Sequence, residues 1–263
     1  MSDKELLIDY LEDLQRAGVS DLCWEEGTPA AVFGLSLPVV GNPQKKESNN
    51  KESNHGGSEM KKADQVPSGS SGDRMELLLE IAAKVALCKR CPELVKNRTQ
   101  TVFGSGNPYS ELVFIGEGPG ADEDKQGLPF VGRCGQLLTD IIEKGMKIPR
   151  KEVYICNIVR CRPPGNRTPL TSEAECCRPF LDATLKIVAP KYICCLGSCA
   201  AGNLLQTNTP IGQLRGQVFD YQGIKVICTY HPAYLLRNPA AKAQTWEDIK
   251  LLMKIMGLAV PKK

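Results

Sequence analysis

From residue 74 onward, the apolar residues follow two spacings, one typical of buried strands and one typical of amphipathic helices. Runs of consecutive apolar residues predict strands covered on both faces at 111–116, 153–159 and 192–196. A hairpin of 216–221 and 224–229 adds a fourth core strand. Apolar residues at helical spacing predict helices at 74–87, 132–144, 171–188, 198–205 (with Ser198 as N-cap) and 245–256. Strands that alternate with helices indicate an α/β fold with a parallel sheet covered on both faces.

Each predicted core strand ends at a polar or glycine-rich position. Glu117 follows the first strand within a turn of three glycines and a proline, and Asn157 lies in the second. Gly197 follows the third strand, and His231 follows the fourth. The carboxyl ends of parallel strands meet at one edge of a sheet, where open α/β sheets bind ligands. We therefore expect these residues to form one site.

The first 73 residues differ from the rest. Apolar residues at helical spacing predict a short helical extension within 1–40, either a docking element for a protein partner or a helix that packs on its own domain. Residues 41–73 are rich in Gly, Asn, Ser, Lys and Glu, and we expect a disordered linker because such a segment buries too little apolar surface. The folded domain is then 74–263.

Composition and charge narrow the class of protein. The chain has no run of eighteen apolar residues and a charged N-terminus, so we expect neither a membrane span nor secretion, but a cytoplasmic protein. Residues 1–74 carry 8 basic and 13 acidic side chains, whereas residues 75–263 carry 25 and 17. A basic folded part is compatible with a phosphate-backbone partner.

Cysteine is the compositional outlier, with 12 residues against two histidines. Cys88 and Cys91 form a CxxC pair after a helix, Cys161 follows in Arg-Cys-Arg-Pro-Pro, and Cys176 and Cys177 are adjacent on a later helix. One CxxC pair with separated cysteines suits an iron–sulfur cluster better than a zinc ribbon, which usually has two pairs. Structural zinc and a thioredoxin-like pair stay open as alternatives.

Four motifs occur in order: Gly-Glu-Gly-Pro-Gly at 116–120, Pro-Phe-Val-Gly at 129–132, Cys-Arg-Pro-Pro at 161–164, and His-Pro-Ala-Tyr-Leu-Leu-Arg-Asn-Pro at 231–239. Together with the CxxC pair, they closely resemble the iron–sulfur family 4 uracil-DNA glycosylases over about residues 75–258. The resemblance implies a three-layer α/β/α sandwich around a central four-stranded parallel sheet. It also implies a [4Fe–4S] cluster with ligands Cys88, Cys91, Cys161 and Cys177, where the adjacent Cys176 could replace Cys177.

The implied reaction assigns roles to the site residues. Such an enzyme flips a nucleotide out of the duplex, reads its edge and breaks the N-glycosidic bond. Phe130 would stack on the base, and the Asn157 amide would pair with uracil O4 and N3–H. The Gly118 backbone would line the uracil pocket. Glu123 would exclude the thymine methyl group near C5, with a solvated surface carboxylate as the alternative.

The remaining roles concern bond breaking and DNA. His231 would donate a hydrogen bond to uracil O2 as negative charge develops, and Glu117 would position or activate water. After His231, a loop would present Leu235 and Leu236 as an apolar wedge, with Arg237 beside them. The arginines around Cys161 could contact phosphates; they are Arg160, Arg162 and Arg167.

We therefore expect a monofunctional, monomeric uracil-DNA glycosylase that starts base excision repair on single- or double-stranded DNA in the cytoplasm or nucleoid. The alternatives are a non-catalytic iron–sulfur protein that binds DNA or senses redox state, and a glycosylase for other deaminated bases. A nucleotide-binding Rossmann domain is disfavoured because Pro119 interrupts the glycine turn.

Overall fold

The computed structural model describes residues 71–260. The expectations for the extension 1–40 lie outside these residues, as does most of the predicted linker. The first helix, α2 (Ser71–Ala86), begins inside the segment 41–73 that composition assigns to the linker. Its bounds are otherwise close to the predicted 74–87.

A six-stranded sheet forms the centre of the fold, in the order β1-β3-β2-β4-β6-β5. The four central strands are parallel, and the two edge strands pair antiparallel with β3 and β6. The predicted central parallel sheet is thus confirmed, with two further strands at its edges. The strands are β1 (Ser105–Gly106), β2 (Leu112–Gly116), β3 (Tyr154–Asn157), β4 (Tyr192–Leu196), β5 (Val218–Tyr221) and β6 (Ile224–Thr229).

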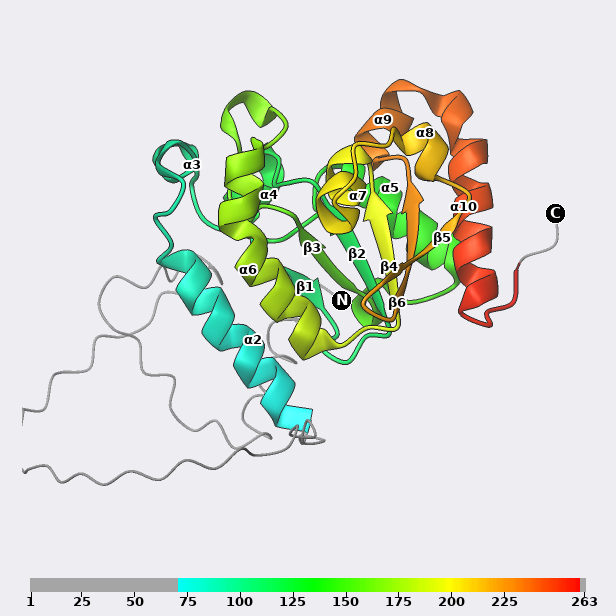
Figure 1. The fold of residues 1–263 in the computed structure, drawn as a ribbon, viewed down its shortest axis with the longest axis horizontal. Helices are drawn as coiled ribbons and strands as arrows, with labels where there is room; N and C mark the ends of the chain where they lie inside the picture. The colour runs from blue at the N-terminus through cyan, green and yellow to red at the C-terminus, as the bar shows by residue number, and fades with distance from the viewer. Residues whose placement is uncertain (1–70, 261–263) are drawn as a thin grey trace, which may run out of the picture. The chain divides into compact units, whose positions relative to one another are not determined.

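Helices cover both faces of this sheet, as the unbroken apolar runs predict (Figure 1). Alternate residues of β2 divide between two cores: Val113 and Ile115 pack with residues of α2, α6 and α7, whereas Leu112 and Phe114 pack with α5, η2 and α10. The three-layer α/β/α sandwich is confirmed. The longer helices here are α5 (Arg133–Thr139) with its π-helical continuation η2 (Asp140–Met146), α6 (Thr171–Val188), α7 (Ser198–Leu205) and α10 (Lys242–Ile255).

Short helices connect these elements, and most of them fall where the sequence pattern predicts loops. They are α3 (Pro92–Asn97), α4 (Ala121–Gln126), α8 (Ile211–Leu214) and α9 (Pro232–Arg237), with 3₁₀ turns η3 (Arg150–Glu152), η4 (Pro164–Asn166) and η5 (Pro239–Ala241). The expectation of a loop after His231 is therefore wrong, because Pro232 occupies the first turn of α9, where its missing N–H costs nothing.

One predicted cap is also wrong. Ser198 is the first residue of α7, and the N-cap is Gly197, whose φ of 91° is a left-handed conformation that favours glycine. A Cβ at Gly197 would lie 2.9 Å from the Cβ of His231, so the glycine also admits that side chain. None of the helices described is long and apolar enough to cross a membrane.

Candidate active site

Two predicted site residues, Phe130 and Asn157, come together at Gly116, at the carboxyl ends of β2 and β3. Gly116 is paired in register with Asn157 across the two strands. A Cβ on Gly116 would lie 2.4 Å from Asn157 Oδ1 and 2.5 Å from the Phe130 ring. Only glycine admits both side chains at this distance, so Gly116 is the position where the amide and the ring meet.

Asn157 is the last residue of β3 and only 1% of it is exposed. Its Oδ1 atom finds no hydrogen-bond partner among the residues described. An unpaired amide oxygen at this depth is costly, and buried polar atoms in native proteins nearly always have a partner. The orphaned oxygen is therefore the strongest sign of a ligand at this point.

Phe130 and His231 lie side by side, with ring centroids 5.8 Å apart and ring planes inclined by 39°. Phe130 is 7% exposed and has a φ of 55°, which is unusual for a residue with a side chain. The Asn157 amide and the His231 imidazole thus both lie near the Phe130 ring, at the edge of the sheet.

His231 is the N-cap of α9, and its Nδ1 accepts a hydrogen bond from the Ala233 N–H at 3.1 Å. An Nδ1 that accepts leaves the proton of the neutral ring on Nε2. Burial, reinforced by the positive charge of Arg237, lowers the pKa of His231 to about 4. At neutral pH the ring is therefore an uncharged donor through Nε2.

Glu117 follows β2 directly and is half-buried. Burial raises the pKa of its carboxyl group, while a hydrogen bond from the Thr168 side chain opposes the shift. Its charge also contributes to the raised pKa of Cys199, and Thr168 and Cys199 both line a groove between α6 and α7. Glu117 therefore lies at the edge of an open groove, beside Gly118, where a Cβ would lie 2.8 Å from Val159.

Glu123, predicted as a pocket residue near uracil C5 or a solvated surface carboxylate, has both carboxylate oxygens bound to backbone N–H groups. Its Oε2 accepts a hydrogen bond from the N–H of Gly120, the N-cap of α4, at 3.1 Å. Its Oε1 accepts hydrogen bonds from the N–H groups of Val131 and Gly132, each at 3.0 Å. Both oxygens are thus bound to the backbone around Phe130.

The predicted wedge divides between the interior and the surface. Leu235 is 1% exposed and packs inside, because α9 directs it toward the core. Leu236 is 41% exposed, and Arg237 is exposed at the end of the same helix. Of the two leucines, only Leu236 is accessible to another molecule in this structure.

Five cysteines line one cavity between three segments of the chain. Cys88 and Cys91 follow α2, Cys161 follows β3, and Cys176 and Cys177 lie on α6. The rest of the lining is largely apolar, including Val85, Leu94 and Phe180. Within 71–260, no three His, Cys, Asp or Glu side chains are close enough together to hold a single metal ion.

The thiols in this cavity affect one another and are contacted by arginines. Burial and the neighbouring thiols, Cys176 first among them, raise the pKa of Cys91 to about 12. Burial also opposes ionisation of Cys88, but hydrogen bonds from Arg90 outweigh it and lower the pKa of that thiol. Arg98 donates a hydrogen bond to Cys161 Sγ at 3.0 Å and another to the Cys88 carbonyl at 3.0 Å.

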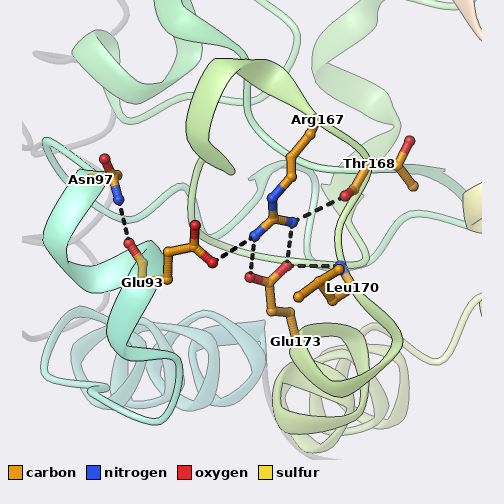
Figure 2. Close-up of polar contacts among 6 residues, drawn as sticks. All are labelled: Glu93, Asn97, Arg167, Thr168, Leu170 and Glu173. Carbon is orange, nitrogen blue, oxygen red and sulfur yellow. Dashed lines mark hydrogen bonds and ion pairs between the residues drawn. The ribbon is translucent and has the colours of Figure 1, made fainter.

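An ion-pair network ties together the segments that carry these cysteines (Figure 2). Arg167, from the loop after Cys161, binds Glu173 of α6 through both nitrogens, at 2.7 and 2.9 Å. The same guanidinium contacts Glu93 of α3 at 3.1 Å and donates a hydrogen bond to the Thr168 carbonyl at 3.1 Å. Glu173 also accepts a hydrogen bond from the Leu170 N–H, so its carboxylate fixes the start of α6.

These contacts change the interpretation of the arginines near Cys161. Arg160 is 1% exposed and donates hydrogen bonds to the Asn157 carbonyl and to Thr184 Oγ1, so the prediction that it meets phosphates is wrong. Arg167 is engaged by carboxylates, and Arg162 bonds Asn166 at 2.8 Å. Sequence analysis also missed Arg150, which binds the backbone of Phe130 from 20 residues away and has no motif to mark it.

Comparisons with known proteins identify the family of this chain. The family model of the uracil DNA glycosylase superfamily matches residues 103–250. A type-4 uracil-DNA glycosylase of Thermotoga maritima is 47% identical over 168 residues, which cover 63% of this chain and 86% of that protein. Type-4 enzymes of Archaeoglobus fulgidus and Sulfurisphaera tokodaii are 38% and 40% identical, over 71% and 72% of this chain and 97% and 88% of theirs. The chain therefore belongs to the uracil-DNA glycosylase superfamily and, within it, to the type-4 enzymes.

Proposed function

We propose that this protein hydrolyses the N-glycosidic bond of deoxyuridine in DNA, releasing uracil and leaving an abasic site for base excision repair. The observation that carries the proposal is the unpaired, buried Oδ1 of Asn157, which meets the Phe130 ring at Gly116, while the other neighbour of that ring is His231. A planar ligand with a donor on its edge would satisfy that oxygen, and uracil offers N3–H.

Recognition of the base follows from this amide. Asn157 Oδ1 would accept from uracil N3–H, while the Asn157 NH₂ group donates to O4. Cytosine has the opposite arrangement, with an acceptor at N3 and a donor at C4, so it would leave the amide mismatched. The Phe130 ring would provide the apolar face on which the flipped base stacks.

His231 would stabilise the departing uracil. Bond breaking moves the electron pair of the glycosidic bond onto uracil N1, and the charge spreads to O2. Nδ1 is occupied by the Ala233 N–H, so the proton on Nε2 is directed away from the helix and is available to O2. A neutral donor that is already in place stabilises this charge without giving up its proton.

Glu117 would act on the water that replaces the base. The oxygen of that water bonds to C1′ of the sugar while the C1′–N1 bond breaks, and its proton passes to the Glu117 carboxylate. The raised pKa of Glu117 makes the carboxylate a better base than an exposed glutamate. The Gly118 backbone adjoins this position.

DNA contacts would come from the end of α9. Leu236 and Arg237 are exposed on the helix whose N-cap is His231, so an apolar group and a cation lie on the same element as that residue. Leu236 would enter the base stack, and Arg237 would bind a phosphate. We propose a monomeric enzyme that acts on single- or double-stranded DNA.

The cysteine cavity fits a [4Fe–4S] cluster better than zinc. Thiols that surround a cavity without converging on one point suit a cluster with one thiolate for each iron, whereas tetrahedral zinc requires four ligands around a single ion. Cys88, Cys91, Cys161 and Cys177 would hold the cluster, with Cys176 as the neighbour of the last ligand. Hydrolysis of a glycosidic bond needs no electron transfer, and the bound cluster would supply a covalent link between the segments of the chain that carry these cysteines.

The test is release of free uracil from a single-uracil oligonucleotide by the iron-loaded protein, compared with Asn157→Ala and Glu117→Ala. We expect release by the wild type and a large loss in both variants. Asn107→Ala is the matched control, because Asn107 is an amide at the β1 edge of the sheet that binds Glu152 at 3.1 Å. No release by the wild type, or an equal loss in the control, would overturn the proposal.

A further inference from the structure

Arg150 binds the backbone of the loop that carries Phe130, although Arg150 lies outside the four sequence motifs. It is the first residue of η3, and its own N–H donates to Glu143 Oε1 at 3.0 Å, which anchors its main chain. One guanidinium nitrogen, Nη2, donates to the carbonyls of Pro129 and Phe130 at 2.9 and 3.0 Å. The other, Nη1, donates to Thr139 Oγ1 at 2.7 Å.

The conformation of this loop needs such support. Phe130 has a φ of 55°, and left-handed backbone costs a residue with a Cβ about 1 kcal/mol or more. The Phe130 carbonyl also points at α5, where a Cβ on Gly135 would lie 1.7 Å from that oxygen. Without Arg150, the carbonyls of two neighbouring buried residues, Pro129 and Phe130, would lose this donor.

Glu123 holds the other side of the same loop. Its Oε1 accepts from the N–H groups of Val131 and Gly132, directly after Phe130. Arg150 therefore binds the carbonyls before and at Phe130, and Glu123 binds the amides that follow it. The ring is fixed from both sides at 5.8 Å from His231.

We infer that Arg150 and Glu123 form a clamp whose function is to fix the Phe130 ring in the position that stacks on the flipped base. Arg150 is thus a positioning residue for excision, acting through Phe130, and Glu123 is the second half of the clamp. This inference rests on the proposed function, since it assigns Phe130 to the base.

The experiment is a double-mutant cycle on the single-turnover rate of uracil excision, measured at saturating enzyme. Arg150→Met should lower the rate roughly 10- to 100-fold, the cost of misplacing a positioned group by about 1 Å. The same substitution in a Phe130→Ala background should lower it by less than about 2-fold, because the group that Arg150 positions is gone. Glu123→Gln should show the same dependence on Phe130.

Arg150→Lys is a milder variant that keeps the experiment decisive if Arg150→Met does not fold. A lysine has no planar fork and cannot serve two carbonyls and a hydroxyl together, so we expect a smaller loss that again disappears in Phe130→Ala. Arg74→Lys is the matched control: Arg74 donates to the Val188 carbonyl at 3.0 Å, at the C-terminal end of α6. Its excision rate should match the wild type.

Two results would overturn the inference. An equal loss with and without Phe130 would show that Arg150 acts through general stability. A weaker affinity for uncleavable DNA with an unchanged rate at saturation would make Arg150 a phosphate ligand. In both cases wild-type release of uracil would stand, whereas absence of release from the wild type and from Arg74→Lys would refute the proposed function itself.

Discussion

The protonation state of His231 is the part of the proposed mechanism that can be tested most directly. The chain has only two histidines, so a His55→Gln variant leaves His231 as the one imidazole to observe. Burial and Arg237 lower its pKa to about 4, and Nδ1 accepts the Ala233 N–H. Protonation of Nδ1 would bring its new N–H group up against the Ala233 N–H group at the start of α9, and the two donors would repel each other.

The protonated fraction of His231 at a given pH follows from this pKa. At pH 5.5 a ring with a pKa of about 4 is roughly 3% protonated, whereas an unshifted ring with a pKa of about 6.5 is roughly 91% protonated. Because the unfolded chain binds the proton more readily, His231 lowers the free energy of unfolding as the pH falls from about 6.5 to about 4. Above about pH 6.5 this effect is absent.

The assay is ¹³C and ¹⁵N NMR of protein labelled at histidine, titrated from pH 8 to pH 5. We expect ¹⁵N shifts of the neutral Nε2–H tautomer that change little across this range. A midpoint near 6.5, or shifts typical of the Nδ1–H tautomer, would refute the assignment of Nε2 as a neutral donor. His231→Ala should then show excision reduced by orders of magnitude with DNA affinity nearly intact, if the leaving-group role is correct.

Three further predictions concern the base-binding amide, the proposed base Glu117 and the ion pairs near the cysteine cavity. Asn157→Ala should lower kcat/KM for uracil excision roughly 10- to 100-fold, since a lost hydrogen-bond pair costs about 1–3 kcal/mol, and unchanged kcat/KM would remove the amide from base recognition. Thr168→Val should raise the pKa of Glu117 further, so the acid limb of the excision rate should move to higher pH and should be missing in Glu117→Gln. Arg167→Met leaves the buried Glu173 carboxylate without its partner, so a chelator should remove iron from the protein faster. An unchanged rate of iron loss would show that this ion-pair network does not stabilise the cluster.

Much of the fold was predictable because long elements carry repeated signals. α6 and β4 have the predicted bounds, and their apolar spacing extends over several turns or a whole buried run. α9 was missed because six residues that begin with proline carry no helical period. The distinction between Leu235 and Leu236 depends on that helix, since adjacent residues on a helix point about 100° apart, whereas a loop leaves both free.

The candidate site was predictable where chemistry and strand ends coincide. Asn157 and His231 are polar residues at the ends of apolar strands, and the structure places both beside Phe130. For Glu123 the sequence shows only that a carboxylate is present, whereas the folded loop shows that backbone amides bind both of its oxygens.

The arginines show why net charge is a poor guide to the DNA-facing surface. The basic excess of the folded part suggested phosphate contacts, yet Arg160 is buried, Arg167 binds two carboxylates and Arg150 binds backbone carbonyls. A guanidinium has five donors in a planar fork, so it can tie together loops that no apolar contact would hold in one conformation. In this site the loops before α5 and α6 are rich in proline and glycine, and arginine binds both. Exposed cations such as Arg237 are then the ones available to DNA, and substitutions should affect DNA affinity there and excision rate at Arg150.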